Sequence, residues 1–218
     1  MQKILSKSLQ DIFSKDVILF VLQIALAALA ISTLIMWLFW GTFTSFIASY
    51  LSWIPWEWLK TSGASMLTFG LSYITFIIVV AILTSFYSEK LLIKLAKKHY
   101  PETEVVGSAD IMTSLFLTLK ATVIFIILLI LLLVFLFIPI VGQIILLYLF
   151  SILLREPTLY DVSSLFIADK KVLKEKKKNT RSLAMIAALF NYVPFLNAFA
   201  AVFAQILFLH HILGKEKV

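Results

Sequence analysis

The chain has 218 residues, of which 61% are hydrophobic and only 14% are charged, yet its formal net charge is +7. A soluble domain has about 45–50% apolar residues. Here the mean hydropathy of +1.01 comes from long apolar blocks, which indicates an integral membrane protein and excludes an ordinary soluble core. Excess lysine and arginine in a membrane protein usually marks cytoplasmic loops, so the charge indicates topology rather than nucleic-acid binding. The absence of cysteine excludes disulfides, thiolate zinc sites and iron–sulfur clusters.

Residues 1–16 have the pattern of an interfacial helix. Apolar residues fall on one face by helical spacing, namely Ile4, Leu5, Leu9, Ile12 and Phe13. Charged residues at intervals of four line another face, namely Lys3, Lys7, Asp11 and Lys15. A helix of this kind lies on the membrane surface. The pattern fits an ordinary start of the first span equally well.

Two long apolar segments follow. Residues 17–40 form the first predicted span, since about 20 apolar residues suffice to cross the hydrocarbon core. The segment 41–65 is rich in aromatic residues but has a single basic residue, Lys60, so it is predicted to be an external loop against the membrane. The second span is predicted over 66–99, as one helix that continues into the cytoplasm and ends before Pro101.

Two further apolar blocks are predicted to form hairpins over 113–155 and 182–213. The segment 156–181 between them is basic and amphipathic, and a basic tail follows the second block. By the positive-inside rule, the N-terminus, the lysine-rich segment 87–120, the segment 156–181 and the tail all lie in the cytoplasm. Each block therefore begins and ends on the same side, which a single span cannot do.

The length of each block argues against two complete spans. Two spans need about 40 residues plus a turn. The apolar part of the first block has about 34 residues, or about 15 per arm after the turn. Such an arm is about 23 Å long at 1.5 Å per residue, which is short of a core of about 30 Å. The predicted fold class is therefore an all-α integral membrane protein with two long transmembrane helices, two half-penetrating helical hairpins and amphipathic surface helices.

The two predicted turns have matching sequences. "FIPIVG" contains Pro139 and Gly142, and "YVPFLN" contains Pro194 and Asn197 at positions 55 residues later, with Asn191 just before it. Proline suits the start of a returning helix, and glycine or asparagine suits a positive φ. Each hairpin with its flank is therefore predicted to be one copy of a degenerate repeat.

Backbone groups in these turns need partners that lipid cannot supply. We therefore expect the turns to be buried in protein or to face water. The side chains of Asn191 and Asn197 are expected to satisfy the backbone of the second turn. Because a chain of this size has little other protein to cover both turns, we also expect a homo-oligomer.

The quoted hairpin segments resemble a known family. "FLFIPIVGQIILLYLFSILLREPTLYD" and "SLAMIAALFNYVPFLNAFAAVFAQILFLHHILG" are similar to the two hairpin regions of the CysZ sulfate permease family, and "ILTSFYSEKLLIKL" at 82–95 is a weaker match. The resemblance covers roughly residues 82–214. It implies two long transmembrane helices and two half-penetrating helical pairs in a bacterial inner membrane, with both termini in the cytoplasm. It also implies oligomeric assembly and inward conduction of sulfate for cysteine synthesis without ATP.

The sequence departs from the family pattern in two places. The family carries a Gly-Leu-Arg-like motif, associated with sulfate binding, just before the first long helix. Here that region reads "LQDIFSKDVILF", with Lys15 as the nearest cation and Asp16 beside it. The family's Pro-Phe before the cytoplasmic extension is replaced by Ser85 and Phe86.

The predicted function is a permease or channel for sulfate or a related oxyanion. The alternative is a membrane scaffold or adaptor protein of the same fold that transports nothing. A dianion needs cations or helix N-termini in a protected place. The candidate substrate-binding residues are Ser14, Lys15, Lys90 and Arg155. Glu89 and Glu156 lie next to two of these cations and are candidates for gating ion pairs.

No enzyme activity, cofactor or metal site is predicted. The histidines are His99, His210 and His211. The pair at 210–211 points to different faces of a helix end and has no carboxylate nearby in sequence. No nucleophile motif or phosphate-binding glycine loop is present. The expected partners are the lipid bilayer, an oxyanion and further copies of the chain, and not nucleic acid.

Overall fold

The computed structural model describes residues 2–177, 180–193 and 195–214, and within these ranges it contains helices and no strand. The protein is therefore all-α, as predicted. The α-helices are α1 (Gln2–Ile12), α2 (Lys15–Tyr50), α3 (Glu57–Tyr87), α4 (Glu89–His99), α5 (Ile111–Leu131), α6 (Val141–Phe166), α7 (Lys170–Lys176), α8 (Thr180–Ala188) and α9 (Asn197–Leu213). Short 3-10 helices, η1 (Leu133–Phe137) and η2 (Leu189–Tyr192), end the first arms of the two hairpins. Among the described helices α2, α3, α5 and α6 are long and apolar enough to cross a membrane.

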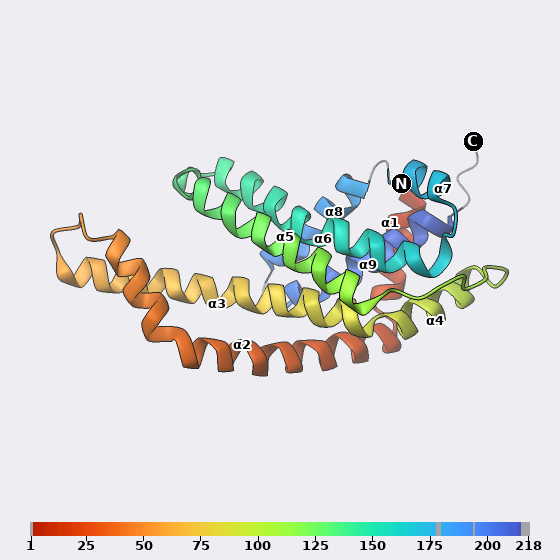
Figure 1. The fold of residues 1–218 in the computed structure, drawn as a ribbon, viewed down its shortest axis with the longest axis horizontal. Coiled ribbons are helices and arrows are strands. Elements are labelled where there is room, and N and C mark those ends of the chain that lie inside the picture. The colour runs from red at the N-terminus through yellow and green to blue at the C-terminus, as the bar shows by residue number, and fades with distance from the viewer. Residues whose placement is uncertain (1, 178–179, 194, 215–218) are drawn as a thin grey trace.

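The helices form three antiparallel pairs, which extend to different distances along the long axis of the molecule (Figure 1). α2 and α3 pack against each other and form the longest pair, with the turn between them at one end of the molecule. The α5–α6 pair runs beside them, and its turn stops short of the α2–α3 turn along the long axis. The α8–α9 pair reaches less far still, while α1, α4 and α7 gather at the opposite end.

The long pair departs from the predicted boundaries. The predicted loop 41–65 is mostly helical, because α2 continues to Tyr50 and α3 already begins at Glu57. Helix satisfies its own backbone hydrogen bonds, which favours it wherever an aromatic-rich segment lies against lipid. The predicted helix 66–99 is interrupted only at Ser88, and backbone bonds continue across it, since Ser88 N donates to Thr84 O at 3.0 Å.

The first hairpin has longer arms than its sequence pattern indicated. α5 has 21 residues, or about 31 Å, and α6 has 26 residues, or about 39 Å, at 1.5 Å per residue. The estimate of about 15 residues per arm was wrong for this hairpin. The first turns of α5 are rich in serine and threonine, and α6 runs on through Pro157 into the predicted segment 156–181.

The second hairpin keeps the short arms. α8 has 9 residues and α9 has 17 residues, which correspond to about 14 Å and 26 Å. Neither helix reaches across a hydrocarbon core of about 30 Å. The argument from arm length therefore applies to this hairpin alone.

The two turns share a positive φ at equivalent positions. The residue after each proline position has a φ of 68° at Ile140 and 69° at Phe195. The positive φ was expected at glycine or asparagine, but Gly142 does not have one. Gly142 is needed for a different reason, because a Cβ there would overlap the carbonyl oxygen of Leu136. Pro194 lies outside the described residues.

The hydrogen bonds of the turns also recur at the same offset. Gly142 N donates to Ile138 O at 2.9 Å in the first turn, and Asn197 N donates to Val193 O at 3.2 Å in the second. Both donors and both acceptors are 55 residues apart. The matched letters of the two turns therefore correspond to a matched local structure.

The core of the molecule lies around α9. Every residue from Ala200 to Ile212 is buried, and the helix packs against α1, α2, α3, α6 and α8. Alanines at 198, 200, 201 and 204 allow this close approach, as small residues commonly do between membrane helices. The central position of α9 brings its polar residues, among them Gln205 and His210, into contact with several other helices.

Candidate functional site

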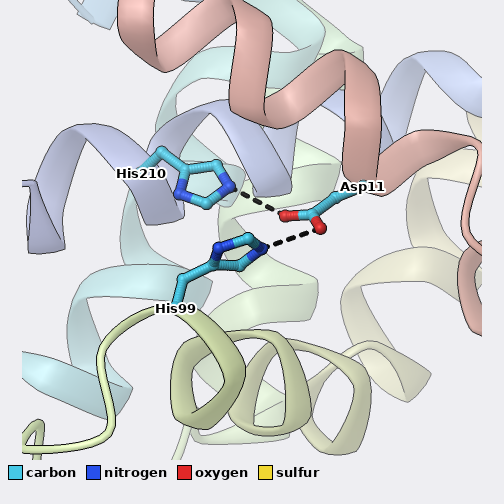
Figure 2. A group of neighbouring side chains, drawn as sticks. All are labelled: Asp11, His99 and His210. Carbon is cyan, nitrogen blue, oxygen red and sulfur yellow. Dashed lines mark hydrogen bonds and ion pairs between the residues drawn. The ribbon is translucent and has the colours of Figure 1, made fainter.

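A first polar cluster, the Asp11 cluster, consists of Asp11 from α1, His99 from α4 and His210 from α9 (Figure 2). Asp11 Oδ1 lies 2.8 Å from His99 Nε2, and Asp11 Oδ2 lies 2.9 Å from His210 Nε2. The side chains of Asp11 and His210 are almost completely buried, and that of His99 is 18% exposed. One carboxylate thus joins three elements that are far apart in the chain.

Further groups surround the Asp11 cluster. Lys98 Nζ donates to Asp11 Oδ1 at 3.1 Å, and Tyr100 Oη lies 3.0 Å from His210 Nδ1. Burial raises the pKa of Asp11, but hydrogen bonds from His210, His99 and Lys98 outweigh it and hold that pKa well below its usual range. Burial and the Asp11 charge raise the pKa of Tyr100. The cluster therefore keeps an ionised carboxylate beside a neutral phenol.

The sequence pattern missed this cluster. Asp11 falls on the predicted lysine-rich face of the first helix, yet it is buried together with Ser8 and Ile12. Of the predicted apolar face, Ile12 is buried and Ile4 and Leu5 pack against the core, while Leu9 and Phe13 are exposed. The first segment thus turns Asp11 toward α9 together with part of its apolar face, and leaves Leu9 and Phe13 where a membrane surface can take them.

A second polar cluster, the Asp161 cluster, lies between the helical pairs. Asp161 of α6 accepts hydrogen bonds from Ser85 Oγ of α3 at 2.5 Å, Ser114 Oγ of α5 at 2.7 Å and Gln205 Nε2 of α9 at 3.4 Å. Asp161 is only 2% exposed. Among the residues that the structure describes, no lysine, arginine or histidine pairs with it. Serine and glutamine donors therefore hold this carboxylate, and it ties four helices together.

A cavity of about 260 Å³ opens beside the Asp161 cluster. Its polar lining includes Ser85, Ser88, Glu89, Ser108, Ser114 and Asp161. Two carboxylates in one cavity repel an anion, so this cavity does not suit a bound oxyanion. The predicted gating residue Glu89 lies in it.

Two of the predicted cations lie on the surface. Lys15 and Lys90 have exposed side chains, and the neighbour of Lys15, Asp16, pairs with Lys94 at 2.8 Å. Ser14 Oγ is buried and makes no hydrogen bond within the described residues.

Arg155 is the most enclosed of these cations. Its side chain is 22% exposed, Nε donates to Thr180 Oγ1 at 3.1 Å, and Nη1 lies 3.4 Å from Glu156 Oε1. Lys177 Nζ also lies 3.4 Å from Glu156 Oε1. The structure thus brings together Arg155 and its predicted ion-pair partner Glu156, and adds a second cation to the pair.

The turns obtain polar partners from tyrosines. Tyr73 Oη of α3 donates to the carbonyl oxygen of Asn191, and Tyr192 Oη donates to the carbonyl oxygen of Gln143 at the start of α6. The Asn191 side chain was expected to satisfy the backbone of its turn. Instead its Nδ2 and Oδ1 are buried and make no hydrogen bond within the described residues.

Several long apolar helices and two hairpins with matched turns define a multi-pass helical membrane protein. The chain belongs to the family described as sulfate transporter CysZ/etoposide-induced protein 2.4, whose family model matches residues 4–201. This match confirms the family resemblance of the hairpin segments. No curated protein and no solved structure matches the chain.

Proposed function

We propose that the protein is a permease or channel for sulfate or a related oxyanion that works without ATP. The observation that carries the proposal is the match to a sulfate transporter family over residues 4–201, which includes the two long helices and both hairpin turns. We further propose that it acts in a bacterial inner membrane with both termini in the cytoplasm, because the basic segments lie at the ends of the apolar blocks.

The hairpins support this function through their helix N-termini. α6 begins at Val141 and α9 begins at Asn197, each directly after a turn. The N-terminus of a helix carries a partial positive charge, which favours an anion. In many transporters such broken helices lie at the substrate site near the bilayer midplane. Half-penetrating hairpins place two helix N-termini at that depth.

Arg155 is the cation best placed to receive the anion on the cytoplasmic side. It is only partly exposed, and its neighbours Glu156 and Lys177 form a small ion-pair network. A sulfate that approaches the guanidinium competes with Glu156 for it. Glu156 is therefore proposed to regulate access to Arg155.

A homo-oligomer completes the proposal. An apolar groove of about 1060 Å³ runs between α2, α3 and the second turn, and Phe195 at that turn is 89% exposed. A second copy of the chain seated in this groove would cover the turn, which lipid alone cannot satisfy.

The alternative function is a membrane scaffold or adaptor without transport. It is favoured by one observation: Lys15 and Lys90 have exposed side chains, so water and salt screen their charge. Proteoliposomes separate the two functions. A permease takes up radiolabelled sulfate down its gradient, and Arg155→Ala slows that uptake while Lys171→Ala, at an exposed position in α7, leaves it unchanged. If intact oligomers in tight vesicles give no anion flux, the permease proposal is lost and the scaffold remains.

A further inference from the structure

The Asp11 cluster has a ligand chemistry that anion transport does not use. We propose that Asp11, His99 and His210 bind one divalent first-row transition-metal ion of the zinc class. Their three candidate ligand atoms, two imidazole Nε2 atoms and a carboxylate oxygen, all lie within 4.8 Å of one another. Imidazole and carboxylate together are the ligands of zinc and related ions, and three protein ligands leave a fourth position for water.

The geometry requires little rearrangement to hold such an ion. Bonds of about 2.1 Å in a tetrahedral site place ligand atoms about 3.4 Å apart. The Asp11 oxygens now lie 2.8 and 2.9 Å from the two Nε2 atoms, so each histidine nitrogen must move away from the carboxylate by about half an ångström. The two imidazole rings stand at 78° to each other with centroids 5.0 Å apart. In Figure 2 one nitrogen of each ring faces the same carboxylate, and the two rings do not stack.

The surroundings of His210 match those of a metal-binding histidine. A ligating imidazole almost always donates its other ring N–H to an oxygen outside the site, and this bond fixes the tautomer and the ring orientation. Tyr100 Oη lies 3.0 Å from His210 Nδ1 and can accept a hydrogen bond from the Nδ1–H group. His210 Nε2 now lies in hydrogen-bond contact with Asp11, and with the ring proton on Nδ1 its lone pair binds an ion placed between them.

The charge balance also allows an ion to bind. The Asp11 carboxylate already forms an ion pair in this structure. Lys98 now supplies the counter-charge at 3.1 Å from Oδ1, but its side chain is 58% exposed. It can therefore turn into water when a metal ion takes its place. The partly exposed ring of His99 gives the ion a way in, since the other two side chains are closed off.

A bound ion would join the N-terminal helix to the rest of the protein. Asp11 lies in α1, His99 in α4 and His210 in α9. An ion held by all three clamps α1 against the end of the second long helix and the central helix. It is therefore expected to stabilise the folded protein by mass action, more strongly as its free concentration rises.

The competing explanation is a metal-free hydrogen-bonded cluster, since every group named above already has a protein partner. The test uses the full chain with an affinity tag that contains no histidine, stripped with a chelator and reloaded with zinc chloride. We expect about one zinc per chain by elemental analysis after desalting, and a rise in the thermal unfolding midpoint. Cobalt(II) should give the intense visible absorption of a low-coordinate nitrogen and oxygen site.

Matched variants locate the ion. His99→Ala and His210→Ala should abolish zinc retention. His211→Ala should keep it, because His211 Nε2 lies 2.9 Å from Lys176 O, outside the cluster. Tyr100→Phe removes only the outer hydrogen bond and should weaken zinc binding about 10- to 100-fold. Size-exclusion profiles show which variants are folded, and wild-type stoichiometry with the cobalt spectrum decides the question if a variant fails to fold. The proposal is overturned if wild type retains no zinc, or if His99→Ala and His210→Ala retain as much as His211→Ala.

Sulfate flux is read separately in the same preparations. Zinc binding without flux leaves the metal site standing and removes the permease. Sulfate flux without zinc binding leaves the permease standing and removes the metal site.

Discussion

Gly142 controls how closely the first turn can fold back, because a Cβ at this position would overlap the carbonyl of Leu136. We expect Gly142→Ala to destabilise the protein by about 1–3 kcal/mol, the usual cost of forcing extra volume into a closed space. Gly70→Ala is the control, since a Cβ there meets nothing within 4 Å. Thermal unfolding in detergent measures both. Equal effects of the two substitutions would show that the turn does not need this close approach.

Asp110 gives a residue-scale test that depends on pH. Its Oδ2 accepts hydrogen bonds from Thr113 N at 2.8 Å and Thr113 Oγ1 at 2.7 Å, and it caps α5. Hydrogen bonds from the Thr113 side chain and backbone lower the pKa of Asp110. A lowered folded-state pKa contributes stability above the unfolded value of about 3.9, and this stability is lost as the pH falls below it.

The predicted result is that Asp110→Ala lowers the unfolding midpoint near neutral pH, and that the gap to wild type narrows as the pH falls below about 4. Asp110→Asn keeps a good capping side chain without the charge. Its unfolding midpoint at neutral pH should therefore lie between those of wild type and Asp110→Ala. A gap between wild type and Asp110→Ala that stays constant with pH would contradict the assigned role of the ionised cap.

At the scale of elements, the second hairpin depends on α3 for a polar partner. Tyr73 Oη donates to the carbonyl of Asn191, where no other described side chain does. Tyr73→Phe should cost about 0.6–2 kcal/mol, as interhelical hydrogen bonds in membrane proteins do. Tyr87→Phe on the same helix is the control, because its side chain is exposed and makes no hydrogen bond to the described residues. Equal free energies of unfolding for Tyr73→Phe and Tyr87→Phe would contradict a stabilising hydrogen bond from Tyr73 to this turn.

The matching turns were predictable because their determinants are local. A proline, its neighbours and the glycine or asparagine after it set the backbone within a few residues, and the structure repeats the positive φ at Ile140 and Phe195. Hydropathy alone could not show where α5 begins, since its first turns contain Thr113, Ser114 and Thr118. Those hydroxyl groups are compatible with a helix whose polar side meets Asp161.

The Asp11 cluster was not predictable in the same way. Asp11 and His210 are 199 positions apart, and their contact depends on how α1 packs on α9. The spacing of four residues among the lysines placed Asp11 on a solvated face, whereas tertiary packing buried it. Of the predicted binding residues, only Arg155 and Glu156 come together in an ion pair, because they are adjacent in α6.

At the scale of the whole molecule, the account rests on hairpins that turn inside the bilayer. The α2–α3 turn extends furthest, and the two hairpin turns lie progressively nearer the opposite end (Figure 1). We propose that both hairpin turns lie within the membrane, where their helix N-termini are offered to an anion.

Labelling of single cysteines from outside tests this architecture most directly, since the natural chain has no cysteine. Trp53→Cys in the α2–α3 turn should react with an impermeant maleimide in intact cells or oriented vesicles. Phe137→Cys and Phe195→Cys at the hairpin turns should not, although all three side chains are highly exposed in the structure. Glu156→Cys, in the part of α6 beyond the apolar block, should react only after the cytoplasmic side is opened. External labelling of Phe137→Cys or Phe195→Cys at the rate of Trp53→Cys would show complete spans and contradict the hairpins on which the proposed pathway depends.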